Sequence, residues 1–334
     1  IEGGAGNSIR KDLYLLVDRE GEILSLRPEM TVAIARLAAT YLQEEFLPQR
    51  LYYSANVFRH VQPHLAQYRE FWQMGIELLG APGIWADAEI ITIAIKSMRA
   101  LGLDDIKISL NQIEIFNSLL ADCNLAPEHR EIIRKQIEEK DLVALNRTLE
   151  NLPVSDELKE SIAMLPVLHG GLDILNRIPY LQKNRRASQA AGELQKVCEA
   201  LRVSGVIGSI VVDMGVLRGL DYYTGIVFEG YSPNLGYGLL GGGRYDRLLG
   251  QFGFESPATG FAMGLDRLAL VLHRKEKEPV RYLIGGHNFP AMIAEADRLR
   301  EQGWIVEIDT RGRPRAVLEE QIKEHPEYSL LYFE

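Results

Sequence analysis

The sequence predicts an α+β fold, with a mostly antiparallel sheet flanked by helices and a small α/β domain behind it. Two observations carry this prediction. In the first part of the chain, strand-like runs such as residues 51–59 and 71–79 follow one another through polar connections, and such hairpins join antiparallel strands. After residue 279, strand and helix patterns alternate, which is typical of a parallel sheet. We therefore expect a core over residues 1–275 and a second domain over 279–334.

The first expected elements are a β-hairpin and a helix. Residues 13–17 and 23–26 read as strands, and the polar tetrapeptide at 18–21 between them is turn-like. A helix over 30–41 follows, because its apolar residues recur at near-helical spacing and Pro28 stands just ahead of it.

The middle of the chain adds two strands, a helix and a helical insertion. Residues 51–59 and 71–79 are strands joined by a polar loop. Residues 85–101 have the apolar periodicity of an amphipathic helix that stops at a glycine. Alternating apolar residues at 106–110 predict a strand. From about 112 to 205 the chain is mainly helical and rich in charge, without a repeat.

The remaining elements complete the core and build the second domain. We expect strands over 209–213, 222–231 and 237–243, and a helix over 261–273 whose apolar residues share one face. The charged stretch at 274–278 indicates a linker. Beyond it, the pattern predicts strand, helix, strand, helix and strand in turn, over residues 281–284, 291–301, 305–309, 316–323 and 329–333.

Composition excludes several classes of protein. The chain has 334 residues, of which 46% are hydrophobic and 25% charged, and its net charge of −9 argues mildly against a nucleic-acid surface. Its two cysteines, Cys123 and Cys198, form neither a metal-binding spacing nor a disulfide framework. No apolar run approaches the ~20 residues of a membrane span, and no signal peptide is visible. We expect a cytoplasmic protein without membrane contact. Because the chain opens at Ile1 without an initiator Met, we also expect residues ahead of it.

Residues 217–247 gather phenols and charges of both signs between segments that read as strands. A pocket for a small zwitterion needs such residues, because a carboxylate is bound well by a guanidinium and an ammonium by carboxylates and phenols. The residues of interest in this block are Arg218, Asp221, Tyr222, Tyr223, Glu229, Arg244, Tyr245 and Asp246.

Two further clusters have both a structural and a functional interpretation. Glu29 and Thr31 lie at a strand end just before a helix. The spacing alone favours a helix start, and a carboxylate aimed at a ligand ammonium is the alternative. In the strand 71–79, Gln73 and Glu77 share one face, because strand side chains alternate. That face is either solvated or the floor of a polar cleft.

Other patterns indicate ordinary structure. With no cysteine and no third ligand nearby, His60 and His64 indicate a polar loop rather than a metal site. The G-x-G-x-x-G match at 236–241 is no dinucleotide fingerprint, since its last glycine opens no helix and no acidic residue follows about 20 positions on. The glycines at 241–243 instead suit close approach of a backbone or a ligand. Taken alone, Arg267 is an exposed arginine on an amphipathic core helix.

Together these motifs resemble the class II aminoacyl-tRNA synthetase core in its histidine-specific form, over about residues 10–273 in order. The second motif of that family corresponds to 58–71 and the third to 260–267. The histidine signatures correspond to 218–223 and 242–246. The resemblance implies a class II synthetase-like fold and a histidine-binding set of Glu29, Thr31, Arg59, Gln73, Glu77, Arg218, Tyr222, Tyr223 and Tyr245.

Four departures from the synthetases separate two branches of the family. Val61 replaces the glutamate that helps to hold adenine, Gln67 replaces an arginine for the ATP phosphates, and Met30 replaces a glycine. Losing such contacts costs on the order of 2–4 kcal/mol per group. The C-terminal domain of about 55 residues is also shorter than an anticodon-binding domain. These features resemble the synthetase-like regulatory subunits of ATP phosphoribosyltransferase.

That resemblance implies a non-catalytic regulatory subunit without a cofactor. In that family, the subunit joins the short catalytic subunit of ATP phosphoribosyltransferase in a hetero-oligomer, which performs the first step of histidine biosynthesis and is inhibited by histidine. It also implies a self-dimer, histidine as ligand and no tRNA binding. The alternatives are an active histidyl-tRNA synthetase, since Arg59, Arg218 and Arg267 remain, and a stand-alone histidine sensor with another partner.

Overall fold

The computed structural model describes residues 10–62, 67–217, 222–233, 237–272 and 281–334. The chain divides into two compact units, Ile1–Leu272 and His273–Glu334. The sequence placed the division a few residues later, at the charged stretch 274–278. Each unit is described by itself below.

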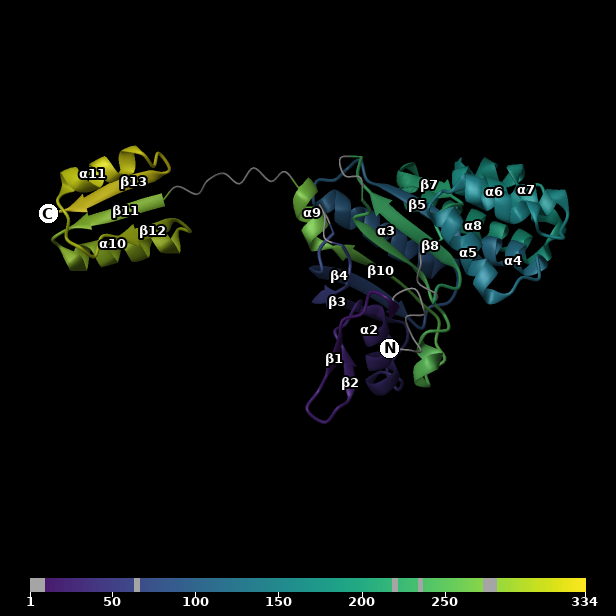
Figure 1. Ribbon diagram of the computed structural model, residues 1–334. Coiled ribbons are helices and arrows are strands. Elements are labelled where there is room, and N and C mark those ends of the chain that lie inside the picture. The colour runs from purple at the N-terminus through teal and green to yellow at the C-terminus, as the bar shows by residue number, and fades with distance from the viewer. Residues whose placement is uncertain (1–9, 63–66, 218–221, 234–236, 273–280) are drawn as a thin grey trace. The chain divides into compact units, whose positions relative to one another are not determined.

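The first unit is built on a large sheet (Figure 1). Its neighbouring strands are antiparallel apart from the parallel pair β5–β7, which confirms the predicted mostly antiparallel core. Across the sheet, the described strands are β3 (Gln49–Phe58), β4 (Glu70–Leu79), β10 (Ala258–Gly264), β9 (Leu240–Arg244), β8 (Ile226–Tyr231), β5 (Lys107–Gln112), β7 (Ile210–Asp213) and β6 (His169–Gly170).

Helices supply the rest of the core. The buried isoleucines and methionine of α3 pack with the apolar side chains of β5 into one large hydrophobic cluster, whose burial is the main source of stability. The insertion predicted at about 112–205 is helical as expected. The described helices of this unit are α2 (Thr31–Tyr41), α3 (Ile84–Ala100), α4 (Ile113–Asp122), α5 (Pro127–Glu138), α6 (Leu142–Glu150), α7 (Asp156–Met164), α8 (Arg185–Val203) and α9 (Leu265–Val271).

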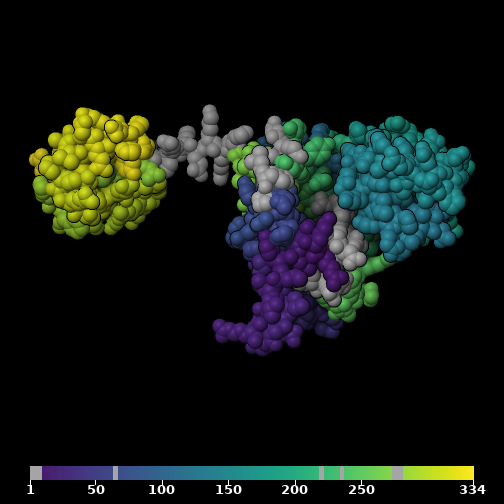
Figure 2. Space-filling view, in the orientation of Figure 1, coloured from purple at the N-terminus to yellow at the C-terminus, as the bar shows by residue number. Residues whose placement is uncertain are grey.

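The predicted hairpin is present, as β1 (Leu15–Val17) and β2 (Ile23–Ser25). The Asp18 carboxylate closes its turn by accepting hydrogen bonds from the backbone N–H groups of Glu20 and Glu22, at 3.0 and 2.8 Å. The hairpin projects from the surface of the first unit (Figure 2).

The helix predicted over residues 261–273 is wrong over residues 261–264. Residues 258–264 form β10, which is paired on both sides, with β4 and with β9, and only residues 265–271 form the helix α9. A short apolar run such as Phe261-Ala262-Met263 does not distinguish the two structures by periodicity. The ladders on both sides decide the outcome, because they satisfy the backbone of a strand buried within the sheet.

The second unit has the predicted alternation of strand and helix. Its parallel strands lie in the order β12 (Ile305–Ile308), β11 (Arg281–Gly286), β13 (Tyr328–Phe333). The helices α10 (Phe289–Glu301) and α11 (Arg315–Lys323) cover opposite faces of this small sheet (Figure 1). A separate cluster of buried apolar residues, which includes Ile284 and Met292, forms its core.

Candidate functional site

Two adjoining cavities lie over the face of the sheet formed by β4, β10 and β9. The inner cavity has a volume of about 40 Å³ and the outer cavity about 260 Å³. Four residues line both and mark the junction between them, namely Arg59, Gln73, Gly241 and Ala262. The inner cavity is lined in addition by Glu29, Thr31, Glu77, Tyr222, Tyr223, Tyr245, Gly260 and Phe261.

Eight of the nine residues predicted to bind histidine therefore line one cavity. The ninth, Arg218, lies outside the described residues. The eight come from segments far apart in the sequence: the start of α2, the ends of β3 and β9, the face of β4, and the segment before β8. The structure brings these residues together, while their contact with histidine stays a prediction.

Glu77 is the most deeply buried titratable group of the cavity, with 1% of its surface exposed. Its carboxylate accepts a hydrogen bond of 2.8 Å from the Thr31 hydroxyl and a short one from the Tyr245 hydroxyl. Burial raises the pKa of Glu77 to about 8, against the lowering effect of these two donors. The predicted face of β4 is thus the floor of a polar cleft, and a solvated face is excluded.

Glu29 caps the start of the helix α2 and also lines the inner cavity. Its two carboxylate oxygens accept the backbone N–H groups of Thr31 and Val32, at 2.7 and 2.9 Å, where α2 begins. The structural interpretation of this residue is therefore confirmed. Burial nevertheless raises the pKa of Glu29, with the two N–H bonds and the Arg59 charge acting in the opposite direction.

A glycine makes room for the Glu77 carboxylate. Gly260 on β10 lies directly opposite Glu77 on β4, and a Cβ at this position would overlap the Glu77 Oε2 atom. Alanine at 260 would therefore push the carboxylate out of place. Because residue 260 has no side chain, β4 and β10 can pair at normal strand spacing with the buried Glu77 carboxylate between them.

Aromatic side chains form the walls. The rings of Tyr222 and Tyr223 lie 4.9 Å apart, and those of Tyr222 and Tyr245 lie 5.7 Å apart edge to face. Burial raises the pKa values of Tyr222 and Tyr245 well above the usual range, so these phenols stay protonated as hydrogen-bond donors.

Tyr53 belongs to this polar group and was missed in the sequence. It lies on β3 directly opposite Gly75 of β4, and its ring occupies the space that a Cβ at Gly75 would need. Its hydroxyl donates to Gln73 Oε1 at 3.5 Å. Burial raises the pKa of Tyr53, and the neighbouring Glu77 charge raises it further. The glycine in the middle of a strand was the available signal, since it often marks close approach of a neighbour.

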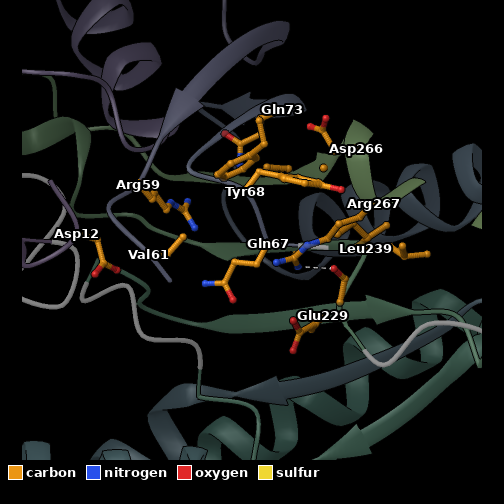
Figure 3. A pocket seen from close by; sticks show the side chains of 16 residues that line it. Asp12, Arg59, Val61, Gln67, Tyr68, Gln73, Glu229, Leu239, Asp266 and Arg267 are labelled. Atoms are coloured by element: carbon orange, nitrogen blue, oxygen red, sulfur yellow. Dashed lines mark hydrogen bonds between the residues drawn. The ribbon is translucent and has the colours of Figure 1, made fainter. Parts of the chain in front are cut away.

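The outer cavity holds two of the residues by which the chain departs from the synthetases. Val61 and Gln67 line it together with Arg59 and Arg267 (Figure 3). The Arg59 guanidinium donates to the Pro28 carbonyl at 2.8 Å and lies 5.4 Å from the centre of the Phe71 ring.

Arg267 is not the exposed arginine that the sequence indicated. It is half-buried, and its Nη1 donates to the Gly238 carbonyl at 2.6 Å. The error follows from the predicted start of the helix. In the structure α9 begins directly after β10, and its first turn lines the outer cavity.

Arg244 belongs to a buried ion pair rather than to either cavity. Its guanidinium contacts Asp87 at 2.9 Å and Asp246 at 2.8 Å, and it also donates to the carbonyls of Ala81 and Gly83. Arg244 and Asp87 are 7% and 4% exposed. The guanidinium that the sequence placed near the zwitterion pocket thus joins β9 to α3. Of the described arginines, Arg59 lines the inner cavity.

The remaining sequence signals concern metal ligands, the glycine match and the helices. Among the described residues, no group of three or more His, Cys, Asp or Glu side chains could hold a metal ion; His60 packs edge-on against Tyr14, and His64 lies outside the described residues. The last glycine of the 236–241 match lies within the strand β9 and opens no helix. Within the described chain, none of the helices has the length and apolar character needed to cross a membrane.

Comparisons with known proteins agree with this geometry. The family model of histidyl-tRNA synthetases matches residues 1–268. The chain is 43% identical to the ATP phosphoribosyltransferase regulatory subunit of Moorella thermoacetica, over 91% of this chain and 78% of the relative. It is 35% identical to the protein of that name from Acetivibrio thermocellus, over 91% and 74%.

Solved structures give the same result. The fold matches an ATP phosphoribosyltransferase regulatory subunit/histidyl-tRNA synthetase from Bacillus halodurans with a TM-score of 0.84 and 31% identity, over 96% of this chain and 83% of that one. A histidyl-tRNA synthetase from a Nostoc species has a TM-score of 0.77 at 20% identity, over 96% and 79%, and so shares the fold. The chain belongs to the histidyl-tRNA synthetase-like family of ATP phosphoribosyltransferase regulatory subunits.

Proposed function

We propose that this chain binds histidine in the inner cavity. In a hetero-oligomer with the short catalytic subunit of ATP phosphoribosyltransferase, it makes the activity of that enzyme depend on the histidine concentration. It catalyses no reaction itself. One observation supports this most directly. The residues suited to bind an amino acid surround one cavity, while Val61 and Gln67 stand in the adjoining cavity where a synthetase binds ATP.

The feedback acts through a coupling free energy. If histidine binds the inhibited state of the complex more tightly than the active state, it shifts the equilibrium toward inhibition by that difference, typically ~1–3 kcal/mol. The same coupling makes histidine bind more tightly whenever the catalytic subunit holds the inhibited state.

Reconstitution tests the proposal. The purified chain is mixed with a short catalytic subunit, and we expect the two to co-elute in size-exclusion chromatography and to form phosphoribosyl-ATP faster than the catalytic subunit alone. Added histidine is expected to suppress this gain. The absence of a complex would contradict the partner, and a complex whose activity ignores histidine would contradict the sensing role.

An active histidyl-tRNA synthetase is the second candidate, because Arg59, Phe71 and Arg267 still line the outer cavity. Histidine-dependent exchange of pyrophosphate into ATP distinguishes the two. We expect no exchange above background from the pure protein, and exchange at a synthetase-like rate would overturn the regulatory proposal.

The second unit supports the expected absence of tRNA binding. Between residues 281 and 334 it carries seven Lys or Arg and ten Asp or Glu side chains, so it is acidic. Since phosphate binding depends on clustered positive charge, this composition disfavours recognition of an anticodon stem.

Changing Glu77 to Gln removes the charge and keeps the shape of the side chain. We expect histidine binding to weaken by roughly 1.5–3 kcal/mol, the range for a hydrogen bond to a charged group. Calorimetry measures the affinity, and the melting temperature verifies the fold. Glu70→Gln is the matched control, because Glu70 is exposed on the opposite face of the same strand. Equal histidine affinity in the two variants would refute the role of Glu77.

The hairpin supports the expected self-dimer. Its apolar side chains are largely in contact with solvent, with Leu15 63%, Val17 72% and Ile23 72% exposed. Exposed apolar clusters of this kind commonly mark protein interfaces. We expect Ile23→Glu to weaken dimerisation by roughly 1.5–3 kcal/mol, the value of burying such a side chain. Analytical ultracentrifugation measures this, and a monomeric wild-type protein would refute the proposal.

A further inference from the structure

Glu77 faces hydroxyl groups, a second carboxylate and, among the described residues, one arginine. The groups around it come from every neighbouring element: Glu29 and Thr31 at the start of α2, Tyr53 and Arg59 on or just after β3, Tyr222 and Tyr223 before β8, and Tyr245 after β9. Of these, Arg59 is the one cation, and its charge acts on Glu29. Glu77 receives two hydroxyl bonds and, in the described residues, no ion pair.

The surroundings of Glu77 favour its protonated form when the cavity is empty. Burial outweighs the two hydroxyl donors, and the pKa of Glu77 is raised to about 8. This shift favours the carboxylic acid form of Glu77 at neutral pH. The O–H of that acid is free to point into the cavity, because Thr31 and Tyr245 already donate to its two oxygens.

The shapes of the two cavities decide which end of histidine meets Glu77. The inner cavity, at about 40 Å³, has space for only a few water-sized groups, so it does not enclose a whole amino acid. Arg59 and Gln73 at the junction can donate to a carboxylate, whereas Glu77 and Tyr245 line only the inner cavity. The amino-acid head group thus remains at the junction, and the ring reaches Glu77.

We propose that the inner cavity carries a proton on Glu77 before histidine arrives, and that a ring nitrogen of histidine takes this proton as it binds. The Glu77 O–H bond breaks and an N–H bond forms on the imidazole. The products are a carboxylate and an imidazolium held as a buried ion pair, with no proton exchanged with solvent near neutral pH. This inference rests on the proposed histidine binding and adds the protonation state of the bound ligand.

Proton linkage gives the proposal a characteristic pH dependence. Above about pH 8, Glu77 of the empty cavity has lost its proton, so binding must take one up from solvent and weakens as pH rises. Below about pH 6.5, free histidine is already an imidazolium, so the proton on Glu77 must be released and binding weakens as pH falls. Affinity therefore peaks between these values and falls by up to about tenfold per pH unit on either side.

Calorimetry in buffers of different ionisation enthalpy measures both affinity and proton exchange, at about pH 5.5, 7.2 and 8.8. We expect proton release at the lowest pH, almost no exchange at the middle one and uptake at the highest. Thiazolylalanine, whose ring does not become charged in this range, is the matched ligand control. It shares the amino-acid head group and should show no weakening toward low pH.

Three results would overturn the inference. Affinity that rises through pH 8 with release of a proton would mean that Glu77 receives the ammonium group instead. A pH profile that Glu77→Gln leaves unchanged would assign the titration to another group. Equal profiles for histidine and thiazolylalanine would exclude proton transfer to the ring. Absence of histidine binding at every pH would instead contradict the proposed function itself.

Discussion

Replacing Asp87 with Ala is expected to lower the free energy of unfolding of the first unit by about 3–5 kcal/mol, because it leaves a buried guanidinium without its counter-charge. Arg244 is 7% exposed and is held by Asp87 at 2.9 Å. Its contact with Asp246 remains in the variant, and that carboxylate is 41% exposed. Solvent screening makes the remaining contact too weak to compensate for the loss.

Denaturant unfolding followed by circular dichroism measures this loss. Glu89→Ala is a suitable control, because Glu89 lies on the same helix and pairs with Arg50 at the surface, with exposed fractions of 35% and 55%. We expect that control to cost less than about 1 kcal/mol. Similar losses in the two variants would show that the buried pair contributes no more than a surface pair.

Restoring two side chains of the outer cavity is expected to raise ATP affinity by roughly a hundredfold. In Val61→Glu with Gln67→Arg, the new carboxylate can accept from adenine and the new guanidinium can pair with phosphate. Each charge-assisted hydrogen bond contributes roughly 1.5–3 kcal/mol, and each 1.4 kcal/mol is about tenfold in affinity. Both positions line the cavity that Arg59 and Arg267 share, so the new groups join two existing cations.

Fluorescence titration with an ATP analogue measures the affinity of this double variant. Val143→Glu with Gln251→Arg makes the same chemical changes at exposed positions outside both cavities and is expected to leave ATP binding unchanged. Turnover should stay low, because the groups that support the site are not arranged for it. Wild-type protein that binds ATP as tightly as the variant would show that other positions separate this chain from the synthetases.

Much of the fold was predictable because local pattern and tertiary context agree. Strand alternation placed Gln73 and Glu77 on one face, and the structure puts that face under the cavity. The alternating elements after residue 279 were found for the same reason. Where only tertiary pairing decides, the sequence was insufficient. The residues of β10 read as a helix because pairing decides their structure, with β9 on one side and the remote β4 on the other.

The site was predicted in composition and less well in detail. Family resemblance named eight residues that share a cavity, but it could not reveal that Tyr53 reaches them across Gly75. That contact depends on the register between β3 and β4, which one sequence does not contain. Arg244 was misplaced for a related reason, since its carboxylate partner Asp87 lies on a distant helix.

One strand, β4, contributes to the floor of both cavities, and this limits how the protein can evolve. Phe71, Gln73 and Glu77 line the cavities because they alternate along β4, and a slip of one residue would replace all of them at once with their neighbours. A shift of the β4 backbone would thus alter the linings of both cavities at once. Val61 and Gln67, which lie outside the strand in the connection between β3 and β4, can change one at a time. The outer cavity can therefore change by small steps while the inner cavity stays intact.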